Sequence, residues 1–355
     1  MINFNNKSIA IYADEAFSIE YRKKFPVRAK CADGLIRYSN NFKIKAIVDT
    51  TFSSNEKLFK DIKCVKSIEE IENDYIDIFV IGVSPAGGRI SENIRKDVIT
   101  ALERGMDIVS GMHYELNKDI EISALAKKNN CEIWDVRNPI GDFDVASARC
   151  LNFGKPILLT CASDAAIGKM TTGFEIERYL NEKGIKGELI ATGQNAIMIK
   201  GKGISIDRVI GDFMPGAVEK LVIESDESNK FVILEGQGGI CHPGFSSVTL
   251  ALLHGGLPTH LILIDKPIRK HSIGSKDISL PSAKETMEIY EKLALRKIKW
   301  IGISVNSQGL DDKTAKEYIL RLKEITKVPV EDMIRFQTGE LGESAMKHIN
   351  EFYEK

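Results

Sequence analysis

The segment Lys155-Pro-Ile-Leu-Leu-Thr160 runs directly into Cys161-Ala-Ser-Asp-Ala-Ala-Ile-Gly-Lys-Met-Thr-Thr172, and this junction decides the fold of the second half of the chain. The first stretch reads as a buried strand, and a helix is expected from Thr171 to Lys183. A strand, a loop of small residues, Gly-Lys and then a helix are the layout of a phosphate-binding loop. In such a loop, backbone amides and the helix N-terminus face an anion while the lysine adds a compact positive charge.

This loop departs from the usual pattern, G-x-x-x-x-G-K-[ST], at two positions. Ser163 stands at the first glycine, and Met170 replaces the hydroxyl residue that normally ligates Mg²⁺. We therefore predict phosphate binding without a tightly held Mg²⁺, the alternative being an ordinary N-capped helix with an exposed lysine. The residues of this segment expected to contact phosphate are Ser163, Asp164, Gly168, Lys169, Thr171 and Thr172.

A second site-like element is Phe231-Val-Ile-Leu-Glu-Gly-Gln-Gly-Gly-Ile-Cys-His-Pro243. An apolar strand delivers Glu235 and then a glycine-rich loop that contains Gln237 and Gly238. A carboxylate at the end of an apolar run is costly unless it is exposed or paired, which favours a functional role for Glu235. If the sheet is parallel, Gln237 and His242 reach the same crevice, so Glu235 and His242 are candidate catalytic residues and Gln237 and Gly238 candidate cofactor contacts.

Short β-branched runs alternate with helix-compatible stretches throughout both halves of the chain. This alternation predicts an α/β fold with mostly parallel sheets, in which ligands bind at the carboxyl ends of strands. We expect two domains, residues 1–145 and 146–355. The first half lacks a G-x-G-x-x-G spacing, so a nicotinamide cofactor is not expected there.

Several strand ends in this pattern carry candidate binding residues. In the first half, the turn Ile81–Arg89 offers glycines and Arg89, and His113 follows a strand and is a third catalytic candidate; a tight turn and a loop histidine are the alternatives. Lys30 and Arg37 lie in a basic segment that would ordinarily be a solvated face. Further candidates are Gln194 in the substrate pocket, Asn306 for a purine base, and Asp212 as a metal partner or a helix N-cap.

Composition narrows the functional class. The 355 residues carry a formal net charge of -1, so no global field attracts nucleic acid. No stretch approaches the ~20 apolar residues of a membrane span, the N-terminus lacks the layout of a secretion signal, and the six cysteines form no C-x-x-C. We expect a cytoplasmic protein that acts on a small molecule, with a homo-oligomer possible.

The segments SDAAIGKMTTGFEIE, LEGQGGICHPGFSSVTLALLHG and IGVSPAGGRIS, in a chain of this layout, resemble the family named for D-glutamate N-acetyltransferase. Members commonly show GTD where this chain has Ala162-Ser163-Asp164, whereas Met170 agrees with the family. The resemblance implies a Rossmann-like first domain and a P-loop NTPase-type second domain that is distantly similar to dethiobiotin synthetase. It also implies N-acetylation of an acidic amino acid with acetyl-CoA as co-substrate.

Under this acetyl-transfer hypothesis, the loop cradles the coenzyme phosphates and cations bind the acceptor's carboxylates. The substrate-binding candidates are Arg89, Arg37, Lys30 and Gln194, and the candidate bases are Glu235, His242 and His113. The alternative is an ATP-dependent ligase or kinase, in which Asp212 and Glu235 hold Mg²⁺. A nucleotide-sensing or scaffolding protein is a third, non-enzymatic possibility.

Overall fold

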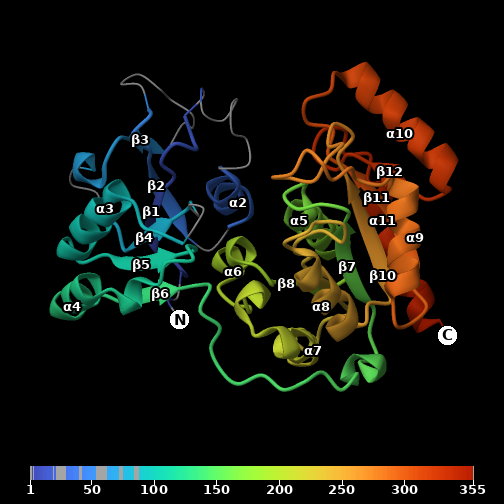
Figure 1. Cartoon of the computed structure of the whole chain (residues 1–355), viewed down its shortest axis with the longest axis horizontal. Coiled ribbons are helices and arrows are strands. Elements are labelled where there is room, and N and C mark those ends of the chain that lie inside the picture. The colour runs from blue at the N-terminus through green and yellow to red at the C-terminus, as the bar shows by residue number, and fades with distance from the viewer. Residues whose placement is uncertain are drawn as a thin grey trace. The chain divides into compact units, whose positions relative to one another are not determined.

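The computed structural model describes residues 2, 4–18, 20, 29–39, 42–52, 62–71, 75–83 and 88–354. The chain forms two compact units, Met1–Ile140 with Gln194–Arg208, and Gly141–Gly193 with Val209–Lys355. Each unit contains one six-stranded parallel sheet. Figure 1 shows the two sheets with their helices. The parallel α/β fold expected from the sequence is therefore confirmed.

The first sheet has the strand order β3-β2-β1-β4-β5-β6. Its central strands β1 and β4 are almost wholly apolar and buried, as expected for a sheet covered on both faces. Helices α3 and α4 pack against each other, and α3 also packs on β5 (Figure 1). The strands are β1 Ser8–Tyr12, β2 Lys43–Val48, β3 Lys63–Val65, β4 Ile78–Ile81, β5 Asp107–Ser110 and β6 Ile133–Asp135, and the helices are α2 Lys30–Tyr38, α3 Glu92–Glu103, α4 Ile120–Lys128 and α6 Gln194–Lys200.

The second sheet has the order β12-β11-β10-β7-β9-β8, with β7 between β10 and β9. Helix α5 packs with α11, and α7 packs with α8. The strands are β7 Ile157–Ala162, β8 Gly187–Ile190, β9 Phe231–Leu234, β10 His260–Asp265, β11 Lys299–Val305 and β12 Val330–Glu331. The helices are α5 Lys169–Glu182, α7 Met214–Ile223, α8 Ser246–Gly256, α9 Ala283–Leu293, α10 Asp312–Thr326 and α11 Glu340–Tyr353.

The units differ from the predicted domains, 1–145 and 146–355, in one segment. The first unit ends at Ile140, close to the expected boundary, but it also takes in Gln194–Arg208 from the second half of the chain. There α6 packs on α2, and the Arg137 guanidinium donates to the Asp207 carboxylate at 2.5 Å. These contacts join segments that are far apart in the sequence, and such contacts leave no periodic pattern from which they could be predicted.

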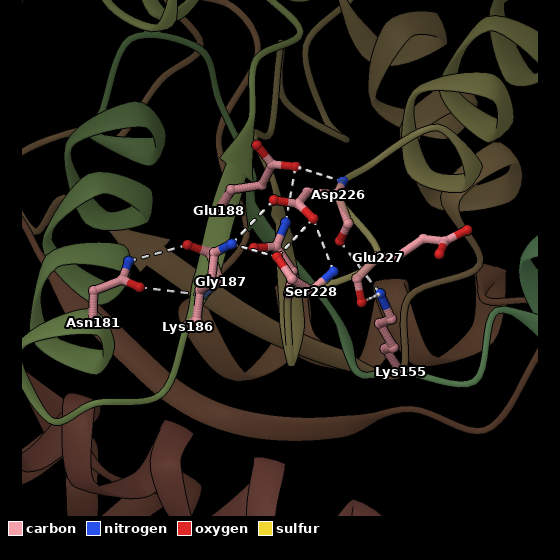
Figure 2. Close-up of polar contacts among 9 residues, drawn as sticks. Lys155, Asn181, Lys186, Gly187, Glu188, Asp226, Glu227 and Ser228 are labelled. Atoms are coloured by element: carbon pink, nitrogen blue, oxygen red, sulfur yellow. Dashed lines mark hydrogen bonds and ion pairs between the residues drawn. The ribbon is translucent and has the colours of Figure 1, made fainter.

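The amino-terminal ends of β7, β8 and β9 meet at a turn of charged and polar residues, drawn in Figure 2. Asp226 accepts hydrogen bonds from the Ser228 amide at 2.8 Å and from Lys186 Nζ at 3.1 Å. Lys155 Nζ donates to the Glu227 carbonyl at 2.8 Å, and the Asp226 amide donates to Glu188 at 3.2 Å. Ser228 and Lys186 hold the pKa of the Asp226 carboxyl well below its usual range. The two lysines at this end of the sheet are therefore bonded within the chain, Lys186 to a carboxylate and Lys155 to backbone carbonyls.

None of the six cysteines forms a disulfide bond. Within the described part of the chain, no helix has the length and apolar character needed to cross a membrane.

Candidate functional site

The loop between β7 and α5 has the backbone of an anion-binding nest. Ala166 and Gly168 adopt positive φ values of 55° and 125°, and Gly168 caps α5 without a side-chain hydrogen bond. The amides of residues 164–168 donate no hydrogen bond to any other described residue. Consecutive unpaired amides at a helix N-terminus suit a phosphate group, so the described residues fit such a ligand.

Lys169 is the first residue of α5 and its side chain is buried. Its Nζ donates to the Asp164 carbonyl at 2.9 Å and to the Gly238 carbonyl at 2.6 Å. Lys169 therefore joins the phosphate loop to the glycine-rich loop that follows β9. The sequence prediction brought these two loops together through the parallel sheet, and the structure does so through this lysine.

The residues after Lys169 are arranged differently from a Mg²⁺-binding loop. Met170 is buried, and Thr171 is half-buried at the first turn of α5. Thr172, predicted to contact phosphate, instead donates its hydroxyl to Ser304 in β11 at 2.8 Å. In the described ranges, no group of three or more His, Cys, Asp or Glu side chains is placed to hold a metal ion.

Asp164 has an anchoring role rather than a place facing the nest. Its carboxylate is fully buried and accepts hydrogen bonds from Arg269 Nη1 at 2.8 Å, the Ile273 amide at 3.0 Å and Ser272 Oγ at 3.3 Å. A carboxylate satisfied in this way ties the phosphate loop to the segment that follows β10. The carboxylate of Asp164 is therefore engaged within the chain, and its backbone amide is the group that faces the nest.

Glu235 directly follows β9 and is 2% exposed, and its carboxylate lies at the end of the neighbouring strand β8. Its Oε2 accepts hydrogen bonds from the amides of Thr192 and Gly193, both at 3.0 Å. The Thr192 hydroxyl in turn donates to the Glu235 carbonyl at 2.7 Å. The carboxylate therefore positions the loop after β8, which explains why an acid can end a buried strand.

The glycine-rich loop lies directly on the phosphate loop. A Cβ on Gly236 would come within 1.7 Å of the Thr160 carbonyl oxygen, and one on Gly239 within 2.3 Å of Asp164 Cα. The Gly236 amide donates to Thr160 Oγ1 at 2.9 Å, so this amide is not available to stabilise an oxyanion. Glycine is required here because the two backbones approach more closely than any side chain allows.

His242 is buried, and both of its ring nitrogens are engaged. Nδ1 accepts from the Gly244 amide at 3.0 Å, so Nε2 carries the proton and donates to the Ile273 carbonyl at 3.1 Å. The ring also stacks on Phe245, with centroids 4.2 Å apart. These contacts hold the loop after β9 against the segment after β10, and they leave neither nitrogen available as a base.

The remaining predicted cofactor contacts surround the same nest. Asn306, after β11, donates from Nδ2 to the Ile167 carbonyl at 2.9 Å. The side chain of Gln237 lies over the backbone of Gly193, and Gly238 offers its carbonyl to Lys169. Ser163 accepts the Cys241 amide at its carbonyl, at 3.0 Å.

In the first unit, the ends of β4 and β5 bring three predicted residues together. A Cβ on Gly88, next to Arg89, would lie 3.7 Å from His113 Cβ. A Cβ on Gly111 would lie 3.3 Å from Gln194 Cγ, so the start of α6 meets the same strand end. Residues 84–87 of the predicted turn lie outside the described residues.

Arg89 and His113 are both exposed at this strand end. Desolvation of the ring, and then the charge of Arg137, lower the pKa of His113 below its usual value. Neither side chain donates or accepts a hydrogen bond within the described residues. A neutral imidazole can accept a proton from a bound cationic group.

The other predicted residues lie elsewhere. Lys30 and Arg37 are exposed on α2, and the Arg37 guanidinium lies over the Tyr38 ring, 5.6 Å from its centroid. Asp212 is exposed in a 3-10 turn before α7, and it is not the cap of that helix, whose N-cap residue is Phe213.

The turn after β1, where the doubly wound fold usually binds a dinucleotide, is occupied by the chain's own carboxylate. Asp49, after β2, accepts hydrogen bonds from the amides of Phe17 at 2.7 Å, Ser18 at 3.2 Å and Ala16 at 3.3 Å. Asp49 thus fills the anion-binding position of this turn with an internal negative charge.

The sequence analysis missed two positioning residues, Thr160 and Ser304. Each is a buried hydroxyl residue within an otherwise apolar strand, and each bonds to a part of the site described above. A polar residue interrupting an apolar strand was the signal available in the sequence.

Comparison with known proteins agrees with this architecture. Residues 144–342 match the model of a domain of unknown function described as the DUF1611_C P-loop domain, and residues 48–139 match the DUF1611_N Rossmann-like domain. A crystal structure of a DUF1611 family protein from Anabaena variabilis superimposes with a TM-score of 0.86 at 30% identity, covering 96% of this chain and 99% of that one.

Two characterised relatives carry the same name. The D-glutamate N-acetyltransferase of Tritonibacter scottomollicae is 35% identical over 284 residues, which are 78% of this chain and 83% of the relative. That of a Pseudoalteromonas species is 35% identical over 260 residues, 72% of this chain and 77% of the relative. From its strand order, its phosphate loop and these matches, the chain belongs to the DUF1611 family, which joins an N-terminal Rossmann-like domain to a C-terminal P-loop domain.

Proposed function

We propose that this protein is an N-acetyltransferase that moves the acetyl group of acetyl-CoA to the amine of an acidic amino acid such as D-glutamate. The observation that carries the proposal is the row of unpaired amides at residues 164–168 beside Lys169, without a hydroxyl residue in the usual Mg²⁺ position. Coenzyme A brings phosphate groups that such a nest binds by hydrogen bonds and charge alone. The names of the two relatives support the same reaction.

In this proposal, the phosphates of the coenzyme bind at the loop of the second unit. The amides of Ser163 to Gly168 and the ammonium of Lys169 surround them, with Thr171 at the first turn of α5. Gln237, Gly238 and Asn306 fix the shape of the nest through the contacts described above.

The candidates for binding the acceptor's carboxylates are cations of the first unit. Arg89 is the strongest candidate because it is exposed and directly follows Gly88, whose backbone lies near His113. Gln194 lies at the neighbouring strand end, and Lys30 and Arg37 on α2 add positive charge. A guanidinium pairs with a carboxylate through two parallel hydrogen bonds, which suits a dicarboxylic substrate.

His113 is the general base of this proposal. Of the three candidates, Glu235 and His242 are committed to backbone hydrogen bonds that hold loops in place. His113 takes a proton from the substrate ammonium, and the free amine attacks the thioester carbonyl. The C–N bond forms, the C–S bond breaks, and coenzyme A leaves as the thiolate, which takes up the proton that the attacking nitrogen loses as the amide forms.

The experiment is a discontinuous assay for N-acetyl-glutamate and free thiol, with acetyl-CoA and D-glutamate in the presence of EDTA. L-glutamate and D-alanine serve as matched acceptors. We expect equal amounts of thiol and acetylated product from D-glutamate, and no requirement for metal. Hydrolysis of ATP that needs Mg²⁺, with no acetyl transfer to any acceptor, would reject the proposal in favour of a ligase or kinase.

A further inference from the structure

Lys266 follows the last residue of β10, at the edge of the phosphate loop. Two residues earlier, Ile264 forms a small apolar cluster with Ala162 and Ile167 of that loop. A Cβ on Gly168 would lie 3.7 Å from Ile264 Cγ2. Because side chains alternate along a strand, Lys266 extends from the same face of the sheet as Ile264.

The neighbouring strand supports this placement. Ile264 pairs with Ser304 in β11, and the Asn306 amide donates to the Asp265 carbonyl at 2.8 Å. Lys266 therefore lies level with Asn306, whose side chain is bonded to the phosphate loop. Asp265 faces the other way and accepts the Tyr318 hydroxyl at 2.7 Å.

The charge of Lys266 is not matched within the described part of the chain. The side chain is only 9% exposed, yet its ammonium makes no hydrogen bond or ion pair with another described residue. The nearest carboxylate of the loop, that of Asp164, is already bonded to Arg269. Burial and the charge of Arg269 lower the pKa of Lys266.

A desolvated ammonium without a counter-ion destabilises the protein on its own. Such a group is typical of binding sites, where the missing negative charge belongs to the ligand. At this strand end, the anion that the loop amides also suit is a phosphate group.

We propose that Lys266 binds a phosphate group of the nucleotide ligand at the phosphate loop. It supplies there the positive charge that a metal ion supplies in loops with Ser or Thr after the lysine. With coenzyme A as the ligand, this inference rests on the proposed function, and it adds a second cation to Lys169.

The test compares Lys266→Met with Lys270→Met, an exposed lysine of the same segment, by calorimetric titration with coenzyme A in EDTA. We expect Lys266→Met to weaken binding about tenfold or more, because a charge-assisted hydrogen bond in a desolvated site is lost. Lys270→Met should stay within about twofold of the natural protein. A change of less than twofold in Lys266→Met, with coenzyme A still bound by the natural protein, would overturn the inference and leave the proposed function intact.

If the natural protein does not bind coenzyme A, the proposed function fails and the same variants are titrated with ADP. A tenfold loss of ADP affinity in Lys266→Met would still support the inference. Equal ADP affinities, or no binding of either ligand by the natural protein, would overturn it.

Thermal unfolding without ligand provides a second readout. Removing an unmatched buried charge should leave the Tm of Lys266→Met equal to or above that of the natural protein. A marked fall in Tm would show that the ammonium stabilises the fold, and would overturn the inference.

Discussion

Lysines at the two ends of the second sheet differ in whether other described residues supply their bonding partners. At the amino-terminal end, Lys186 contacts Asp226 and Lys155 contacts two backbone carbonyls, as Figure 2 shows. At the carboxyl end, Lys266 is buried without a partner among the described residues, and the amides of 164–168 are unpaired. Among the described residues, the polar groups drawn in Figure 2 find partners within the chain, whereas these amides and this ammonium at the carboxyl end do not. The unmatched groups mark the end of the sheet at which we propose that a ligand binds.

The largest effect should follow Lys169→Met. Loss of the ammonium removes the charge that faces the nest and the bridge to the Gly238 carbonyl. We expect acetyl-CoA affinity to fall by about 100-fold or more, as charge-assisted hydrogen bonds to phosphate are lost. Circular dichroism checks that the fold is retained, and a folded variant that still binds acetyl-CoA normally would contradict the account.

A substitution in the glycine-rich loop, at the carboxyl end of the second sheet, should destabilise the protein through backbone strain. Gly239→Ala forces a Cβ to 2.3 Å from Asp164 Cα, whereas Gly244→Ala meets only the His242 ring at 3.6 Å. We expect Gly239→Ala to destabilise the protein by about 1–3 kcal/mol in urea unfolding. Gly244→Ala should change it by about 0.5 kcal/mol or less. Equal free energies of unfolding for the two variants would show that the loops do not pack this closely.

Exceptions to the pairing of polar groups include His260 at the start of β10 and His348, whose ring contacts it. The Nε2 of His260 has no hydrogen-bond partner among the described residues, and burial first, then the charge of His348, lowers the pKa of His260 to about 3. Lys299 and Arg296 lower this pKa further, and Glu351 opposes them.

Since His260 binds a proton more readily in the unfolded chain, the protein should lose stability as the pH falls below about 6.5. The loss from this residue amounts to at most about 1.4 kcal/mol per pH unit down to pH 3. Urea unfolding at pH 7.5 and pH 5 measures it, with His260→Leu as the comparison. A natural protein and a variant with the same pH dependence would show that His260 is not buried in its neutral form.

The pH profile of acetyl transfer tests the proposed role of His113 as the general base. The pKa of His113 is lowered, so the acid limb of kcat/KM should lie below pH 6.5. His113→Gln should lose activity by about 100-fold and abolish this limb. An unchanged profile in that variant would assign the proton transfer to another group.

The smallest effect should follow Lys186→Met, the counterpart of Lys266→Met at the opposite end. Lys186 is exposed and paired with Asp226, and exposed pairs contribute little. We expect a fall in Tm of about 1 °C and unchanged acetyl-CoA affinity. A loss of affinity as large as that of Lys266→Met would remove the contrast between the two ends.

Much of the fold was visible in the sequence because apolar runs and helical periods are local. The β-branched run Ser8–Tyr12 forms strand β1, and the helix-compatible stretch Asp312–Thr326 forms α10. Helix α2 was interpreted only as a basic segment, because part of its apolar face packs on α6 from far along the chain. The placement of α6 in the first unit depends on the same long-range contacts.

The candidate site likewise contains residues that could be predicted from the local sequence and residues that could not. Lys169 and the small-residue loop could be predicted because strand, loop and helix are consecutive. The roles of Asp164, Glu235 and His242 could not be predicted, because each side chain bonds to a segment that lies far away in the sequence. The carboxylate or imidazole that makes these bonds is common to every acidic residue or histidine, so the residue type gives no signal of the role. Lys266 could not be singled out from the sequence, since burial without a partner among the described residues is a property of the folded chain.

The most direct test of the account is calorimetric titration of the protein with acetyl-CoA, with EDTA and then with Mg²⁺, and Lys169→Met alongside. The account predicts the same affinity in both buffers and no measurable binding by the variant. Binding of ATP that requires Mg²⁺, together with no heat from acetyl-CoA, would contradict the claim that this loop holds the coenzyme's phosphates without a metal ion.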